Sequence, residues 1–64
     1  MELKPETQVT IVFDKTFEVY TIAELKEEKP GIMVADIANM VDDIFEQIED
    51  VESVEILGFH YLKN

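Results

Sequence analysis

The segment from residue 32 to residue 51, IMVADIANMVDDIFEQIEDV, constrains the fold of this chain more than any other stretch. At about 100° per residue, its apolar side chains fall on one stripe and its acids fall on the opposite side. The stripe consists of Val34, Ile37, Ala38, Val41, Ile44, Phe45 and Ile48. This pattern predicts one main amphipathic helix over about residues 32–51. Pro30 and Gly31 favour a helix start near Ile32 or Met33.

The polar side of the predicted helix carries six acids, and the position of most of them opposes helix stability. They are Asp36, Asp42, Asp43, Glu46, Glu49 and Asp50. A helix is stabilised by acids in its first turn and bases in its last, yet the last two turns here contain acids and no base. Like-charge neighbours such as Asp42 and Glu46 cost about a few tenths of a kcal/mol. These acids are therefore either a solvated face or a surface that binds a basic partner.

Length and charge exclude several classes of function. The chain has 64 residues, which we interpret as a single domain over residues 1–64, and a net charge of −10 with five lysines and no arginine. Direct nucleic-acid binding needs a cationic surface, and an anionic membrane would repel this chain. There is no cysteine, no apolar run long enough to span a membrane and no signal-peptide pattern. We expect a cytoplasmic protein.

Alternating apolar residues predict strands on both sides of the helix. Residues 8–14 and 17–21 alternate, and a three-residue loop between them would place Phe13 opposite Phe17 and Ile11 opposite Val19. Residues 53–62 form the third predicted strand. A right-handed crossover then gives an α+β fold, β-β-α-β, with a three-stranded antiparallel sheet of order 2-1-3. The Thr21 and Glu24 capping-box pattern favours a short helical turn at 22–28, and continued strand is the alternative.

The third predicted strand is apolar on both faces, which suggests a second covering chain. Val54 and Ile56 alternate onto one face, and later apolar residues alternate onto the other. One helix covers only one face of a sheet, so an uncovered apolar face predicts self-association as a homodimer. The residues predicted for that face are Val12, Tyr20, Leu57, Phe59 and Tyr61. Alternatively, a bulge at Gly58 turns the later residues inward and reduces the patch.

The residues give no support for catalysis or for a metal site. His60 is the only histidine and has no catalytic motif around it. The acids on the predicted helix lack the loop spacing that wraps Ca²⁺ or Mg²⁺ in oxygens. We therefore expect a protein that is not an enzyme and that uses neither a metal nor a cofactor.

In size, acidity and absence of a catalytic set, the chain resembles small proteins of bacteriophages and mobile elements. That resemblance implies an inhibitor or modulator, in some cases a DNA mimic, and it transfers no residue. The leading hypothesis is a non-enzymatic binding protein whose acidic helix face engages a basic surface, such as that of a nucleic-acid-binding enzyme. The alternative is a structural or assembly protein that homo-oligomerises through an apolar sheet face, with the acids serving solubility only.

Overall fold

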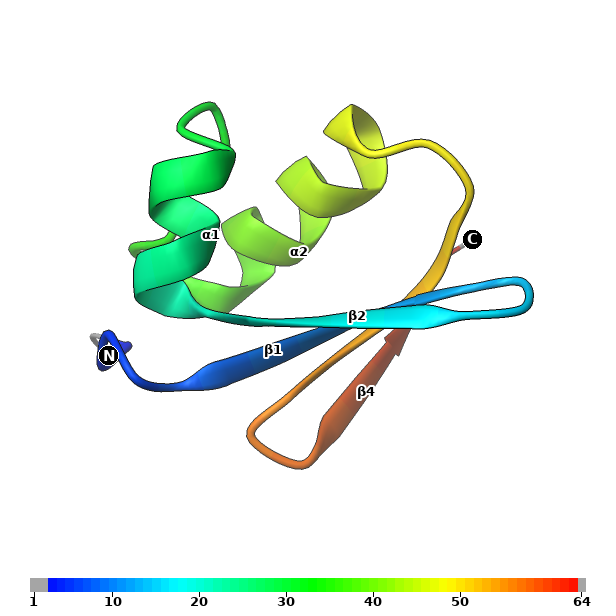
Figure 1. The fold of residues 1–64 in the computed structure, drawn as a ribbon, viewed down its shortest axis with the longest axis horizontal. Helices are drawn as coiled ribbons and strands as arrows, with labels where there is room; N and C mark the ends of the chain where they lie inside the picture. Colours follow the sequence, from blue (N-terminus) through cyan, green and yellow to red (C-terminus); the bar gives the residue numbers. More distant parts are fainter. Residues whose placement is uncertain (1–2, 64) are drawn as a thin grey trace.

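The computed structural model describes residues 3–63 as a two-layer α+β fold, in which an antiparallel sheet carries both helices on one face (Figure 1). The elements are β1 (Gln8–Phe13), β2 (Phe17–Thr21), α1 (Ile22–Glu28), α2 (Ile37–Gln47), β3 (Val51–Ile56) and β4 (Phe59–Leu62). The strand order is β2-β1-β3-β4. The α+β class and the antiparallel sheet are confirmed, and so is the short helix at 22–28. The predicted three strands and single main helix differ from this arrangement in detail.

The main helix, α2, is shorter than the predicted 32–51. It begins after Asp36, whose Oδ1 accepts a hydrogen bond from the Ala38 N–H at 2.9 Å, as an N-cap does. Ile32 is buried nevertheless, because it reaches the core from the loop before the helix. The apolar character of Ile32 therefore reports burial and not helical conformation, and the prediction extended the helix too far on that account.

The predicted third strand is in fact two strands joined by a tight turn. Leu57 and Gly58 have φ angles of 51° and 80°, the two positive values that a two-residue hairpin of type I′ requires. Ile56 consequently pairs with Phe59, and β4 runs back along β3. The turn replaces the bulge considered at Gly58 and adds the fourth strand of the sheet.

The β1–β2 hairpin has a register one residue away from the predicted one. The Phe13 N–H donates to the Thr16 carbonyl at 2.8 Å, which leaves only two residues at the tip. Ile11 then pairs with Glu18, and Val12 pairs with Phe17. The predicted pairing of Phe13 with Phe17 is wrong, and a slip of one residue turns every side chain of β2 to the other face.

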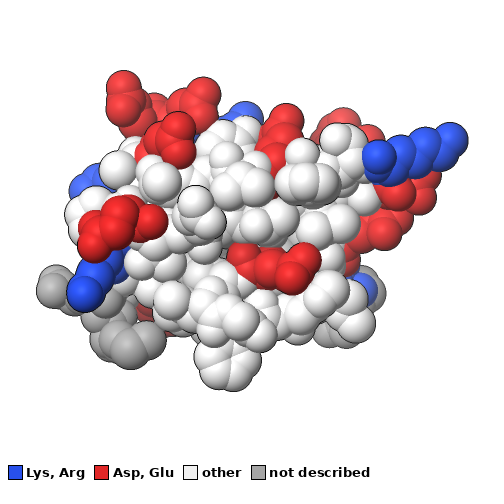
Figure 2. Space-filling model, turned by 60° about the horizontal axis from the view of Figure 1, so that its bottom comes forward, with Lys and Arg blue, Asp and Glu red and all other residues white. Residues whose placement is uncertain are grey.

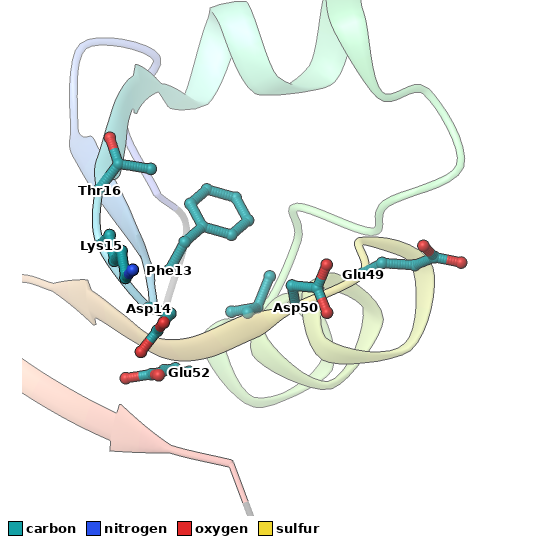
Figure 3. A pocket seen from close by; sticks show the side chains of 8 residues that line it. Phe13, Asp14, Lys15, Thr16, Glu49, Asp50 and Glu52 are labelled. Atoms are coloured by element: carbon teal, nitrogen blue, oxygen red, sulfur yellow. The ribbon is translucent and has the colours of Figure 1, made fainter.

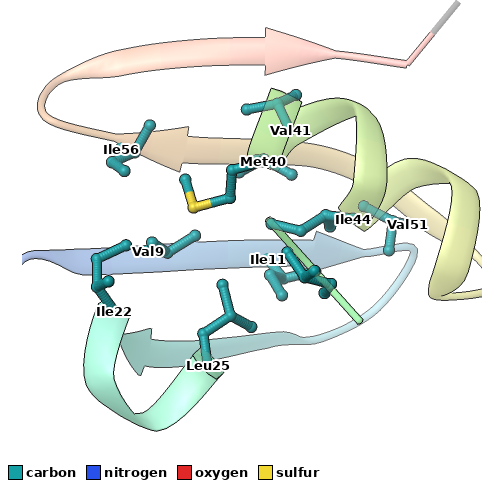
Figure 4. Close-up of a cluster of buried hydrophobic side chains, with 11 residues drawn as sticks. Val9, Ile11, Ile22, Leu25, Met40, Val41, Ile44, Val51 and Ile56 are labelled. Atoms are coloured by element: carbon teal, nitrogen blue, oxygen red, sulfur yellow. The ribbon is translucent and has the colours of Figure 1, made fainter. Parts of the chain in front are cut away.

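The core lies between the helices and the sheet (Figure 4). Strands β1 and β3 provide alternating side chains such as Ile11 and Val54, while α1 and α2 provide Leu25 and Ile44. An irregularity in the β1–β3 pairing leaves Glu52 without a partner in β1. Such a bulge allows Val51 as well as Val54 to face the core.

The N-terminal segment before β1 supports α1. Leu3 packs against the core. The carbonyls of Thr7 and Pro5 accept hydrogen bonds from the N–H groups of Ile22 and Ala23 at 2.9 and 3.0 Å. These bonds satisfy two of the donors that the first turn of a helix leaves unpaired. Residues 1 and 2 lie outside the described part of the chain.

Candidate functional site

Two of the six predicted binding acids hold α2 and its preceding loop in place. Asp36 caps the helix, and its Oδ2 also accepts a hydrogen bond from the Asn39 side chain at 3.2 Å. Asp43 is half-buried, and its Oδ2 accepts the Met33 N–H at 2.8 Å, which ties the loop to the middle of α2. Folding therefore accounts for these two acids without a binding partner.

The other four predicted acids are exposed, and the tertiary structure adds two more beside them. Asp14, at the β1–β2 tip, lines the same hollow as Glu49, Asp50 and Glu52, and this hollow has a volume of about 770 Å³ (Figure 3). Exposed acids of α2 continue the row from this hollow along the helix. We call the whole set the acidic surface: Asp14, Asp42, Glu46, Glu49, Asp50 and Glu52.

Sequence reasoning missed Asp14 because no local pattern connects the hairpin tip with the end of α2. The pairing of Phe13 with Val51 across β1 and β3 brings the two segments together. Lys15 also lines the hollow and is its only lysine. The hollow is therefore acidic and open, a shape that suits contact with a protein surface better than enclosure of a small substrate.

The second candidate surface is the open face, which we define as the side of the sheet away from the helices. The strand pairings align four side chains in one row across this face: Phe17, Val12, Ser53 and Leu62. The two ends of this transverse row are prominent, since Phe17 is 62% exposed and Leu62 is 71% exposed. Ser53 is buried, so the exposed apolar surface of this row lies mainly at its two ends.

A more polar row lies next to the transverse row on the open face. It consists of Val19, Thr10, Glu55 and His60 in the order of the strands. His60 and Glu55 are cross-strand partners on β4 and β3. His60 is exposed on β4.

The residues predicted for self-association do not lie together on one face. Val12 does lie on the open face. Tyr20 lies on the helix side, because it pairs with the buried Val9, and its hydroxyl donates to Glu18 Oε1 at 2.8 Å. This hydrogen bond to Glu18, together with burial and nearby acids, raises the pKa of Tyr20 to about 12.

The C-terminal members of the predicted set are also displaced by the new turn. Phe59 and Tyr61 pair with Ile56 and Val54, so they lie on the helix side, with ring centroids 6.4 Å apart. Leu57 occupies the turn itself. The apolar segment on which the need for a covering chain was argued is thus two strands, β3 and β4, and most of their apolar side chains lie on the helix side. The apolar residues exposed on the open face are instead those of β2 and the end of β4.

Within residues 3–63, no set of three or more histidine, cysteine or acidic side chains is placed to hold a metal ion. Over the same residues, neither helix has the length and apolar character needed to cross a membrane.

Comparisons of the chain with protein-family models, with curated proteins and with solved structures give no significant match.

Proposed function

We propose that this protein is a non-enzymatic binding protein whose acidic surface engages a basic surface of a partner protein. The observation that supports this function is the gathering of exposed acids from the hairpin tip, the turn after α2 and the start of β3 at one hollow. Only some of the acids on α2 serve its folding, as Asp36 and Asp43 do.

The location of the remaining acids is costly for the isolated domain. Asp42, Glu46 and Glu49 lie in the C-terminal half of α2 and just beyond it, where the helix dipole and their mutual repulsion both oppose negative charge. Such a surface would attract a basic partner over a long range. This attraction increases the rate of association and makes binding sensitive to salt. Carboxylates on a rigid scaffold imitate backbone phosphates, so a nucleic-acid-binding protein is the partner class that this chemistry fits.

The test is a charge reversal that leaves the folding contacts intact. The variant Asp42→Lys, Glu46→Lys, Glu49→Lys should fold, melt at a temperature no lower than the parent and lose partner capture from a lysate at low salt. The matched control is Glu6→Lys, Glu27→Lys, Glu28→Lys, which changes three exposed acids away from the acidic surface by the same total charge. We expect the control to capture the partner as the parent does. Equal capture by both variants would mean that the acids form a solvated face and do not bind the partner.

A second candidate function is assembly through the open face, with the acids serving solubility. The observation that favours it is the transverse row, which exposes Phe17 and Leu62 on a sheet face that neither helix covers (Figure 1). Exposed apolar groups gathered on one face commonly mark an interface.

A further inference from the structure

We propose that the open face forms a symmetric homodimer in which two sheets stack face to face, related by a two-fold axis parallel to the strands and located between β1 and β3. This interface is separate from the acidic surface, and it gives the assembly function a specific geometry. It does not depend on whether the acidic surface binds a partner.

Charge distribution identifies a second copy as the occupant of this face. Alternation along the strands places nine side chains on the open face, namely Gln8, Thr10, Val12, Phe17, Val19, Ser53, Glu55, His60 and Leu62. Glu55 is the one acid among them, in a chain of net charge −10. Figure 2, which looks mainly onto this side, shows a broad surface with few charged groups between acids at its border. A basic partner would be drawn to the acids elsewhere, whereas a second copy is repelled least here.

The order of residues in the transverse row makes the face complementary to itself. The two-fold rotation places β2 over β4 and β1 over β3 of the second copy. Each row of side chains therefore faces the same row of the second copy in reverse order. Phe17 then covers Leu62 of the second copy, and Val12 lies over Ser53 of the second copy. Both prominent apolar ends lose their contact with water, and the sheets approach to the usual separation of about 10 Å.

The same two-fold rotation places no two like charges of the polar row opposite each other. Glu55 lies over Thr10 of the second copy, whose hydroxyl is able to donate a hydrogen bond to a carboxylate. His60 lies over Val19 of the second copy. No acid lies directly over its own counterpart, which is the arrangement that an isologous interface of an acidic protein requires.

The test exploits the pairing of Phe17 with Leu62 across the dimer. We expect sedimentation equilibrium of the full chain to give twice the 7.4 kDa mass at high concentration. Phe17→Glu with Leu62→Glu should raise the dimer Kd by at least about tenfold, because like charges would face each other. Phe17→Lys with Leu62→Glu should recover dimerisation relative to that variant. These positions are at opposite edges of one sheet, so the recovered ion pair forms only between copies.

The matched control is Phe59→Glu, which introduces the same charge at a position of the same 62% exposure as Phe17 but on the helix side. It should leave the dimer intact, and circular dichroism should show that all variants remain folded. A parent that stays monomeric at about 1 mM overturns the proposal. The proposal is also overturned if Phe17→Lys with Leu62→Glu dimerises no more tightly than Phe17→Glu with Leu62→Glu.

Edge pairing through β4 is the competing way to form a dimer, and it gives a different signal. The Lys63 N–H donates to the Glu52 carbonyl at 3.1 Å, so alternation points the N–H groups of His60 and Leu62 away from the sheet. Protection of those two amides from hydrogen exchange on dimerisation would show edge pairing and overturn the face-to-face arrangement. Any failure of the dimer leaves the acidic-surface test unaffected, since that test measures capture by a folded chain.

Discussion

At the scale of single residues, neighbouring side chains of the same chemistry have different roles in this protein. Asp42 is exposed, whereas the adjacent Asp43 accepts the Met33 N–H and holds the loop before α2. Tyr20 likewise differs from an ordinary surface tyrosine, because its hydroxyl donates to Glu18. Both differences depend on which partner the fold brings near, and both are open to direct measurement.

Alanine substitution should separate the two aspartates. Asp43→Ala removes a hydrogen bond to a charged acceptor and should lower the free energy of unfolding by about 1–2 kcal/mol. Asp42→Ala should leave stability unchanged or raise it by about a few tenths of a kcal/mol, because it relieves repulsion with Glu46. Urea denaturation of both variants checks this. Equal losses would mean that the contact of Asp43 with the loop contributes little.

Tyr20 should make stability depend on pH in the alkaline range. Its folded-state pKa is about 12, above the ordinary value of 10.0, so the stabilisation is complete below pH 10 and is lost as the pH rises through about 12. Tyr61→Phe leaves Tyr20 as the one titrating tyrosine, so tyrosinate absorbance then reports its pKa. Adding Glu18→Gln should lower that pKa towards the ordinary value. An unchanged titration would exclude the Glu18 carboxylate as its cause.

At the scale of elements, two turns decided the strand register and the number of strands, which the apolar periodicity of the sequence left open. The two-residue tip of the β1–β2 hairpin set which face β2 presents. The Leu57–Gly58 turn divided one apolar segment into β3 and β4. Leucine is unusual in the left-handed conformation, which costs a side chain other than glycine, asparagine or aspartate about 1–2 kcal/mol.

Replacing that leucine should therefore stabilise the β3–β4 hairpin. Leu57→Asn creates the Asn-Gly pair that type I′ turns prefer, and Leu57 is 51% exposed, so little burial is lost. We expect an increase of about 0.5–1 kcal/mol in the free energy of unfolding. Gly58→Ala should have the opposite effect, because its φ of 80° strains a side chain. Thermal melts that rank these two variants the other way would contradict the turn conformation.

At the scale of the whole molecule, charge and apolar surface are separated. The acidic surface includes the hollow between the hairpin tip and the end of α2 and the exposed acids of α2, while the open face has few charges. A net charge of −10 on 64 residues makes self-repulsion a general opponent of folding. The separation is also what allows one small chain to offer two different surfaces.

Salt should consequently stabilise the protein. Raising NaCl from about 0.01 M to about 1 M shortens the Debye length from about 30 Å to about 3 Å, which screens the repulsion among acids. We expect the thermal midpoint of the parent to rise over this range. The midpoint of the Asp42→Lys, Glu46→Lys, Glu49→Lys variant should rise less, because part of its repulsion is already removed. Identical salt responses would locate the repulsion outside the acidic surface.

The sequence by itself determined the features that depend on local chemistry. The Thr21 and Glu24 capping box favoured α1 over a continued strand, and both of its hydrogen bonds are present. The apolar stripe identified the buried side of α2, including Val41 and Ile44. Alternation identified Val9 and Ile11 as core residues of β1. Each of these signals lies within a few residues, so no distant contact was needed to interpret it.

Only the tertiary structure decided where α2 starts, which face β2 presents and which acids meet. Ile32 packs into the core from a loop as well as it would from a helix, so its spacing did not distinguish the two conformations. Phe17 and Tyr20 are both aromatic, so hydrophobicity alone allowed either register of β2 until the turn fixed one. Asp14 joins the acids after α2 through strand pairing between distant segments. Apolar patterning measures burial, whereas register and surface assembly depend on turn closure and long-range pairing.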